Sequence, residues 1–136
     1  MKDVLIINKI KILNGKAVCD ISVDSARCFT NAKFASCITK IRPKLVKHSC
    51  MNEGSDFFGD VISNTGMHHL LEHLIIDFQV SANPSSTYKF AGNSYWVDKD
   101  QGLAQVSVNF YDDLIVLKAI QDAKNLINKI EFSCYL

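Results

Sequence analysis

The sequence predicts an α+β protein, an antiparallel sheet of two β-hairpins with helices packed on one face, in the order ββα, α, ββα. Two pairs of segments with alternating apolar residues each flank a turn sequence. Between and after them lie segments with apolar residues at helical spacing. With 48% hydrophobic and 21% charged residues, the composition is that of a globular chain, and we expect residues 1–136 to form a single domain.

The first hairpin is marked by Asn14-Gly15, a dipeptide that favours the two-residue type I′ turn. The segments "LIINKIKIL" and "KAVCDISV" flank it. If Leu13 pairs with Lys16, regular alternation places the apolar residues of both strands on one face. These residues are Ile6, Ile10 and Ile12 from the first strand, opposite Val23, Cys19 and Ala17 from the second. We expect this face to be the buried one.

Two helices are expected in the middle of the chain. The segment "TNAKFASCITKIRP" has Thr30 or Asn31 as its N-cap and a proline just past its end. The segment "LVKHSCMNEGSD" is interpreted as a connection, followed by a helical turn at 57–62. The segment "SNTGMHHLLEHLIIDFQVSANP" begins with capping-type residues and ends at Asn83-Pro84, which leaves room for about four turns of helix.

The second half repeats the plan of the first. The segments "TYKFAGNSYWVD" and "LAQVSVNFYD" flank the loop "KDQG". A four-residue loop with regular alternation places Val97 opposite Ala104 on the core face and leaves Trp96 on the other face. The segment "DLIVLKAIQDAKNLINKI" then predicts a closing helix, with acids at its start and lysine near its end, as the helix dipole favours.

Charge and cysteine content argue against several classes of protein. Formal net charge is +1 with lysines and acids interspersed, so we expect no nucleic-acid partner. No apolar run approaches the ~20 residues that span a bilayer, and the N-terminus lacks a signal-peptide core, so we expect a soluble cytoplasmic protein without membrane association. The five cysteines are odd in number and form no CxxC, which favours reduced thiols over disulfides or a cysteine zinc site.

The stretch "TGMHHLLEHLIIDF" holds three of the four histidines. On a helix, His69, Glu72 and His73 project from one face in the HxxEH order of inverted zincins, while His68 lies about 100° around the helix. Two imidazoles one turn apart can bind a single Zn²⁺, and the glutamate beside them can act as general base. The motif therefore predicts a zinc-dependent peptidase or amidase-like hydrolase. The alternative is a solvated helix face without a metal.

A catalytic zinc needs a third protein ligand, and the sequence leaves four candidates. Glu131 is the only glutamate downstream of the motif. Asp112 and Asp113 lie between the last strand and the last helix, where either can instead be an N-cap. His48 stands in "KHSC" and can equally pack beside the helices. The choice among them stays open.

Two segments, "LVKHSCMNEGSDFFGDVISNTGMHHLLEHLIIDFQV" and "VDKDQGLAQVSVNFYDDLIVLKAIQDAKNLI", resemble the N-terminal domain of cyanophycin synthetases. That domain has a similar H-x-C stretch, a Thr/Gly turn leading into an H-x-x-E-H helix, and a hairpin that runs through a tyrosine and acids into a closing helix. The resemblance covers about residues 40 to 130. The synthetases also carry an ATP-grasp and a Mur-ligase-like domain, for which this chain has no room, so we do not expect it to make the Asp-Arg polymer.

The resemblance implies a domain that holds the polymer and, in some members, trims it at a metallopeptidase-like site. It implies His69 and His73 as metal ligands, Glu72 as general base, and a peptide or cyanophycin-like polymer as partner. We expect such a peptide to add as a strand at a sheet edge near Asn93, with Trp96 on the contact surface. The alternative is a non-catalytic polymer- or protein-binding module with a vestigial HxxEH helix, which includes a homodimer formed through the sheet edge.

Overall fold

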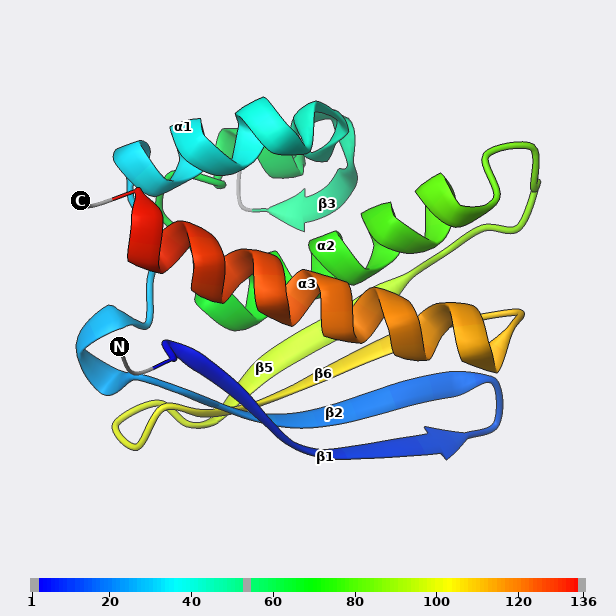
Figure 1. Ribbon diagram of the computed structural model, residues 1–136, viewed down its shortest axis with the longest axis horizontal. Coiled ribbons are helices and arrows are strands. Elements are labelled where there is room, and N and C mark those ends of the chain that lie inside the picture. The colour runs from blue at the N-terminus through cyan, green and yellow to red at the C-terminus, as the bar shows by residue number, and fades with distance from the viewer. Residues whose placement is uncertain (1–2, 53–54, 135–136) are drawn as a thin grey trace.

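A computed structural model describes residues 3–52 and 55–134 and confirms the predicted class (Figure 1). Four strands form one antiparallel sheet in the order β1-β2-β6-β5. They are β1 (Leu5–Leu13), β2 (Lys16–Val23), β5 (Gly92–Asp98) and β6 (Leu103–Asn109). The helices α1 (Ala32–Ile41), α2 (Met67–Ala82) and α3 (Asp113–Ser133) lie on one side of this sheet. Helices α2 and α3 cover the sheet, and α1 lies beyond them (Figure 1).

The stretch expected to be a connection carries a second, small sheet. Strands β3 (Ser49–Asn52) and β4 (Ser55–Phe57) pair antiparallel. The short 3₁₀ helices η2 (Pro43–Lys47) and η3 (Phe58–Asp60) flank them, and another, η1 (Ser25–Arg27), follows β2. Because η2 contacts α2, the start of β3 is held beside the histidine-rich helix. No helix in the described ranges is long and apolar enough to cross a membrane.

The turn of the first hairpin is as predicted. Asn14 and Gly15 have φ angles of 50° and 77°, the left-handed region that a type I′ turn requires. Before it, however, a β-bulge at Asn8 shifts the register, so that Val23 lies opposite Leu5 and not Ile6. Leu5 is buried, whereas Ile6 is 46% exposed. Ile10 and Ile12 have their expected partners Cys19 and Ala17, but they are 38% and 43% exposed, so the expected burial fails for them as well. The prediction for Ile6 was wrong because one extra residue reverses the face of every residue before it.

A second bulge, at Val97, overturns the predicted face of Trp96. Four residues, 99–102, close the β5–β6 hairpin as expected, but Trp96 takes the position opposite Ala104. Ser94, two residues before Trp96, points to the same face of the sheet, and α2 covers this face. Val97 is left 60% exposed. Strand β5 therefore turns Trp96 and Ser94 toward the helices.

The N-terminal ends of α1 and α3 are capped as the sequence favoured. The side chain of Asn31, one of the two N-cap candidates of α1, accepts a hydrogen bond from the Phe34 amide. The carboxylate of Asp112 accepts hydrogen bonds from the amides of Leu114 and Ile115 at the start of α3. The predicted apolar stripe of α3 is buried at Val116, Ile120, Ala123, Ile127 and Ile130.

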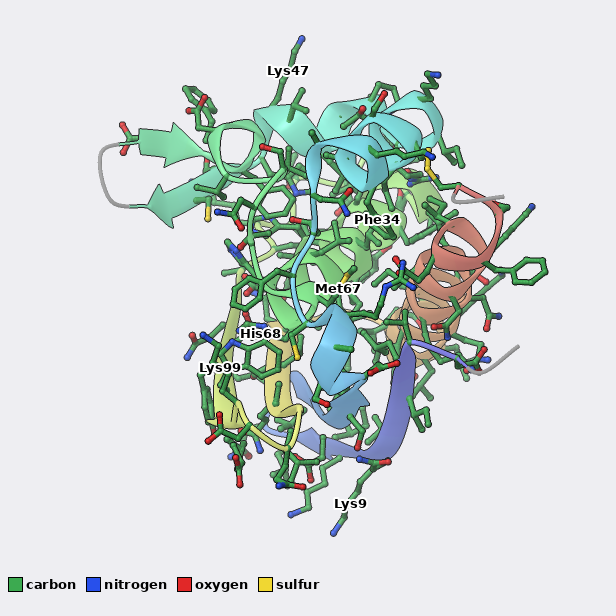
Figure 2. The ribbon with its side chains drawn as sticks, turned by 90° about the vertical axis from the view of Figure 1, so that its left-hand side faces the viewer. Lys9, Phe34, Lys47, Met67, His68 and Lys99 are labelled. Atoms are coloured by element: carbon green, nitrogen blue, oxygen red, sulfur yellow. A yellow bond between two sulfur atoms is a disulfide. The ribbon has the colours of Figure 1, made fainter. Side chains whose placement is uncertain are left out.

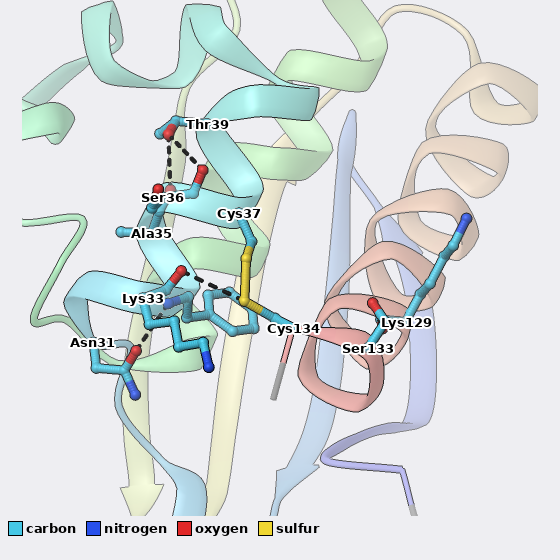
Figure 3. Close-up of a disulfide and its surroundings, with 10 residues drawn as sticks. Asn31, Lys33, Ala35, Ser36, Cys37, Thr39, Lys129, Ser133 and Cys134 are labelled. Carbon is cyan, nitrogen blue, oxygen red and sulfur yellow. Dashed lines mark hydrogen bonds between the residues drawn. A yellow bond between two sulfur atoms is a disulfide. The ribbon is translucent and has the colours of Figure 1, made fainter. Parts of the chain in front are cut away.

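A disulfide joins α1 to the end of α3 (Figure 3). It links Cys37 in α1 to Cys134 at the end of α3, with the two Cα atoms 6.6 Å apart. The prediction of reduced thiols throughout was therefore wrong for this pair, while Cys19, Cys28 and Cys50 are not disulfide-bonded. The partners stand 97 residues apart in sequence, and only the packing of α1 against α3 brings them together.

Candidate metal centre

Helix α2 is buried around most of its circumference, and the buried set includes its charged side chains. His69, His73 and Asp77 follow one another at four-residue intervals and so lie on one face. Glu72, His73 and Asp77 are 7%, 3% and 4% exposed. A solvated helix face, the alternative left by the sequence, does not describe these residues. Buried polar groups of this kind require partners, and the partners define the site.

A pocket of about 1080 Å³ opens beside this face of α2. Its walls come from three parts of the chain: α2 itself, residues 44–50 of η2 and the start of β3, and residues 88–94 leading into β5. All three residues of the HxxEH motif, His69, Glu72 and His73, line it. The motif therefore faces a cavity large enough for a ligand.

Cys50, which was expected to be a reduced thiol with no metal role, lies with the two motif histidines. Its Sγ is 3.2 Å from His69 Nε2. One ligand atom from each of Cys50, His69 and His73 lies within 4.8 Å of the other two. Around a tetrahedral zinc with Zn–S near 2.3 Å and Zn–N near 2.0–2.1 Å, neighbouring sulfur and nitrogen ligands are about 3.5 Å apart. The three side chains thus fit a divalent metal, and a thiolate with two imidazoles favours Zn²⁺.

The surroundings hold both imidazoles in place and keep them neutral. The ring of Phe58 stacks on His73 with centroids 4.0 Å apart and meets His69 edge-on at 5.0 Å. Thr65 Oγ1 lies 2.8 Å from His69 Nδ1, while Nε2 of the same ring faces Cys50. Burial lowers the pKa of His69. Burial, with His69 and His48 nearby, lowers the pKa of His73 to about 3. Neutral imidazole is the form that binds metal.

Glu72 lies beside the three candidate metal donors. Its Oε1 accepts a hydrogen bond of 2.8 Å from Ser94 Oγ, and its Oε2 is 4.0 Å from His73 Nε2. Burial raises the pKa of Glu72, and the Ser94 hydrogen bond opposes the rise. A Cβ on Gly92 would lie only 2.7 Å from Glu72 Cγ, so the absence of a side chain there leaves room for the carboxylate. A buried carboxylate with a raised pKa beside a metal site is suited to general base chemistry.

Three of the sequence candidates for a third ligand lie elsewhere. Asp112 caps α3, and Asp113 is exposed in the first turn of that helix. Glu131 forms an ion pair with Arg27. None of these three acids lines the pocket.

His48, the fourth candidate, does line the pocket. Its Nδ1 lies 3.2 Å from Nδ1 of His73, and its Nε2 lies 3.3 Å from Asp77 Oδ1. Asp77, and Cys50 as a candidate donor, were not predicted from the sequence. Two signals for them were present: Asp77 stands four residues after His73, and Cys50 belongs to the H-x-C stretch.

The two residues expected at the substrate surface differ in position. Asn93 lines the pocket at the β5 edge. The Trp96 ring instead packs 4.3 Å from the ring of His68 and 6.3 Å from that of Phe29. His68 lies over strand β5 at the start of α2 and is 8% exposed (Figure 2). Together, His68 and Trp96 join the beginning of α2 to the sheet.

The fold and the site define an α+β domain with a histidine- and cysteine-lined pocket on a buried helix. The family model of the cyanophycin synthase-like N-terminal domain matches residues 19–131, and the chain belongs to this family. The match confirms the resemblance seen in the sequence and extends it into the first hairpin. A comparison with curated proteins gave no match.

Proposed function

We propose that the chain is a zinc-dependent peptidase- or amidase-like hydrolase that acts on a peptide or a cyanophycin-like polymer. One observation carries the proposal: Cys50, His69 and His73 offer three metal donors in the same pocket as the buried carboxylate of Glu72. A bound Zn²⁺ would act as a Lewis acid toward a carbonyl oxygen and would acidify water.

Glu72 moves the proton in this proposal. Its carboxylate accepts a proton from the attacking water and returns it to the leaving amine. Burial favours both transfers, because it raises the pKa of Glu72 toward neutral pH, where the carboxylate can both take up and release a proton. Ser94 holds Oε1 of the carboxylate, and Oε2 is the oxygen nearer to His73. Ser94 thus orients the base.

Strand β5 offers a binding mode for an extended chain. It stands at one end of the strand order, so its outer edge pairs with no other strand of the described sheet. A peptide that adds to this edge along residues 92–94 would pass beside Glu72, because Gly92 and Ser94 both approach that carboxylate. Lys44 and Lys47 line the same pocket and would meet acidic groups of the bound chain.

Metal content is the first test. Purified protein that has been loaded with Zn²⁺ and dialysed should retain about one ion per chain, and Cys50→Ser and His73→Ala variants should retain less. With Co²⁺ in place of Zn²⁺, wild type should show a thiolate-to-metal charge-transfer band that Cys50→Ser lacks. A wild-type protein that retains no stoichiometric metal would refute the hydrolase. If it still binds the polymer, it is the non-catalytic module that the sequence left as the alternative.

Hydrolysis is the second test. Glu72→Gln should keep zinc and lose about 10²–10⁴-fold in hydrolysis of a β-Asp-Arg or general peptide substrate. A Glu72→Gln variant as fast as wild type would remove Glu72 from its role. The matched variant Glu131→Gln alters the downstream glutamate, which pairs with Arg27 outside the pocket. It should keep both zinc and hydrolysis, whereas loss of zinc from a variant that stays folded would contradict the placement of Glu131 outside the site.

A further inference from the structure

A line of polar contacts runs along α2 toward His73 and begins at Arg42, the C-cap residue of α1. Arg42 Nε lies 2.6 Å from Asp77 Oδ2, and its Nη2 donates to Ser81 Oγ at 2.7 Å. The guanidinium also lies over the ring of Phe78, 4.1 Å from its centroid. Three contacts thus fix Arg42, and with it one oxygen of the buried Asp77.

The other oxygen of Asp77 continues the line. Oδ1 lies 3.3 Å from His48 Nε2, and His48 Nδ1 lies 3.2 Å from His73 Nδ1. Burial would raise the pKa of Asp77, but hydrogen bonds from His48 and Arg42, together with the charge of Arg42 and that of His48 when it is protonated, outweigh it and lower the pKa. The line therefore runs guanidinium, carboxylate, imidazole, imidazole.

Hydrogen-bond chemistry gives this line one direction. A carboxylate only accepts, so His48 donates to it from Nε2. In its neutral form His48 has a single N–H, so its Nδ1 is an acceptor and the donor facing it is Nδ1–H of His73. A protonated His48 would donate from both nitrogens and would leave the proton of His73 on Nε2, so the direction is that of the neutral state. The lone pair of His73 is then on Nε2, the nitrogen 4.0 Å from Glu72 Oε2.

We propose that Arg42, Asp77 and His48 are positioning residues that hold His73 in its Nδ1–H tautomer, with Nε2 available to a metal ion. That this line of contacts serves metal binding rests on the proposed function, whereas the tautomer of His73 itself needs no metal. His69 differs in this respect. Its Nδ1 meets the hydroxyl of Thr65, which can donate or accept and so does not impose a tautomer.

The substitution Asp77→Asn should reverse the line. Arg42 has only donors, so the amide oxygen must face it, and the amide NH₂ then faces His48 Nε2. His48 would now donate from Nδ1, and His73 would accept at Nδ1 and carry its proton on Nε2. Nε2 of His73, the nitrogen proposed to bind the metal, would then be protonated, and we expect zinc affinity to fall by about 10–100-fold.

The experiment combines histidine nitrogen NMR of the metal-free protein with zinc titration. Spectra at about pH 8, above the ordinary histidine pKa of about 6.5, should show His73 as the Nδ1–H tautomer in wild type and as Nε2–H in Asp77→Asn. Competition with a chromophoric chelator measures zinc affinity. Asp122→Asn is the matched control, because Asp122 Oδ2 pairs with Lys118 Nζ at 2.7 Å on the outer surface of α3. It should change neither readout.

A second variant guards against misfolding of Asp77→Asn. His48→Phe keeps a ring and leaves the Arg42–Asp77 pair intact, but it removes the acceptor for His73, so His73 should become a mixture of tautomers. Wild-type His73 found as Nε2–H would overturn the inference, and so would a tautomer that neither variant changes. Wild type with the Nδ1–H tautomer but no retained zinc would instead overturn the proposed function and leave this line of contacts standing.

Discussion

The disulfide between α1 and α3 leads to a stability prediction whose size follows from chain length. Cys37 and Cys134 stand 97 residues apart in sequence. In the chain-entropy model, a cross-link over that separation removes about 16 cal/mol/K from the unfolded state, or about 4.7 kcal/mol at 25 °C. Disulfides measured in proteins contribute about 2–5 kcal/mol. We therefore expect Cys37→Ser/Cys134→Ser to lose about 2–5 kcal/mol of unfolding free energy.

Urea denaturation of oxidised protein, with and without reductant, measures this loss. When reductant is added, the unfolding free energy of wild type should fall to that of the double variant. In thermal denaturation, the melting temperature of wild type should drop by roughly 10 °C under the same change. The double variant, which has no disulfide, should not respond. Thiol titration of denatured, oxidised wild type should find three cysteines, namely Cys19, Cys28 and Cys50. Five titratable thiols would refute the pairing, and an intact disulfide with no effect on stability would refute the entropic reasoning.

Three further predictions concern the pocket and the start of α2. In Gly92→Ala, the new Cβ would lie 2.7 Å from Glu72 Cγ, about 1 Å inside ordinary contact distance, so hydrolysis should fall by about 10²-fold while zinc is retained. A wild-type rate would contradict the placement of the base. Ser94→Ala removes the hydrogen bond that lowers the pKa of Glu72, so the acid limb of the kcat/KM profile should move to higher pH; an unmoved limb would separate Ser94 from the base. Burial, with His69 nearby, lowers the pKa of His68 from 6.5 to about 4, so the folded state binds fewer protons than the unfolded state in this range. Between about pH 6.5 and 4, His68 should therefore contribute a loss of up to roughly 1.4 kcal/mol of stability per pH unit as pH falls, in addition to the losses from His69 and His73, whose pKa values burial also lowers. His68→Phe should remove its own part of the slope in urea titrations, and an unchanged slope would contradict the burial of a neutral His68.

The fold was predictable wherever a local pattern has one structural solution. The Asn14-Gly15 turn and the four-residue loop at 99–102 formed as expected. The faces of Ile6 and Trp96 were predicted wrongly, since each depends on a β-bulge. A bulge changes the pairing by one residue without a distinctive local sequence, and the alternation that carries the prediction is reversed beyond it.

The candidate site divides in the same way. Helical geometry places His69, Glu72 and His73 on one face whatever surrounds the helix, because their spacing matches the helical repeat. The candidate metal donor Cys50 could not be assigned from sequence. It reaches His69 only because the start of β3, in the stretch read as a plain connection, lies beside α2.

The sequence by itself determined the helices, the hairpin turns and the phase of the HxxEH motif, since each depends on residues within a few positions of one another. Tertiary structure alone decided the faces of the strands beyond their bulges, the Cys37–Cys134 disulfide, and the line from Arg42 to His73. These features join residues from separate segments. Their contacts exist only once the sheet, the helices and the small hairpin have packed together, because no local spacing relates one segment to another.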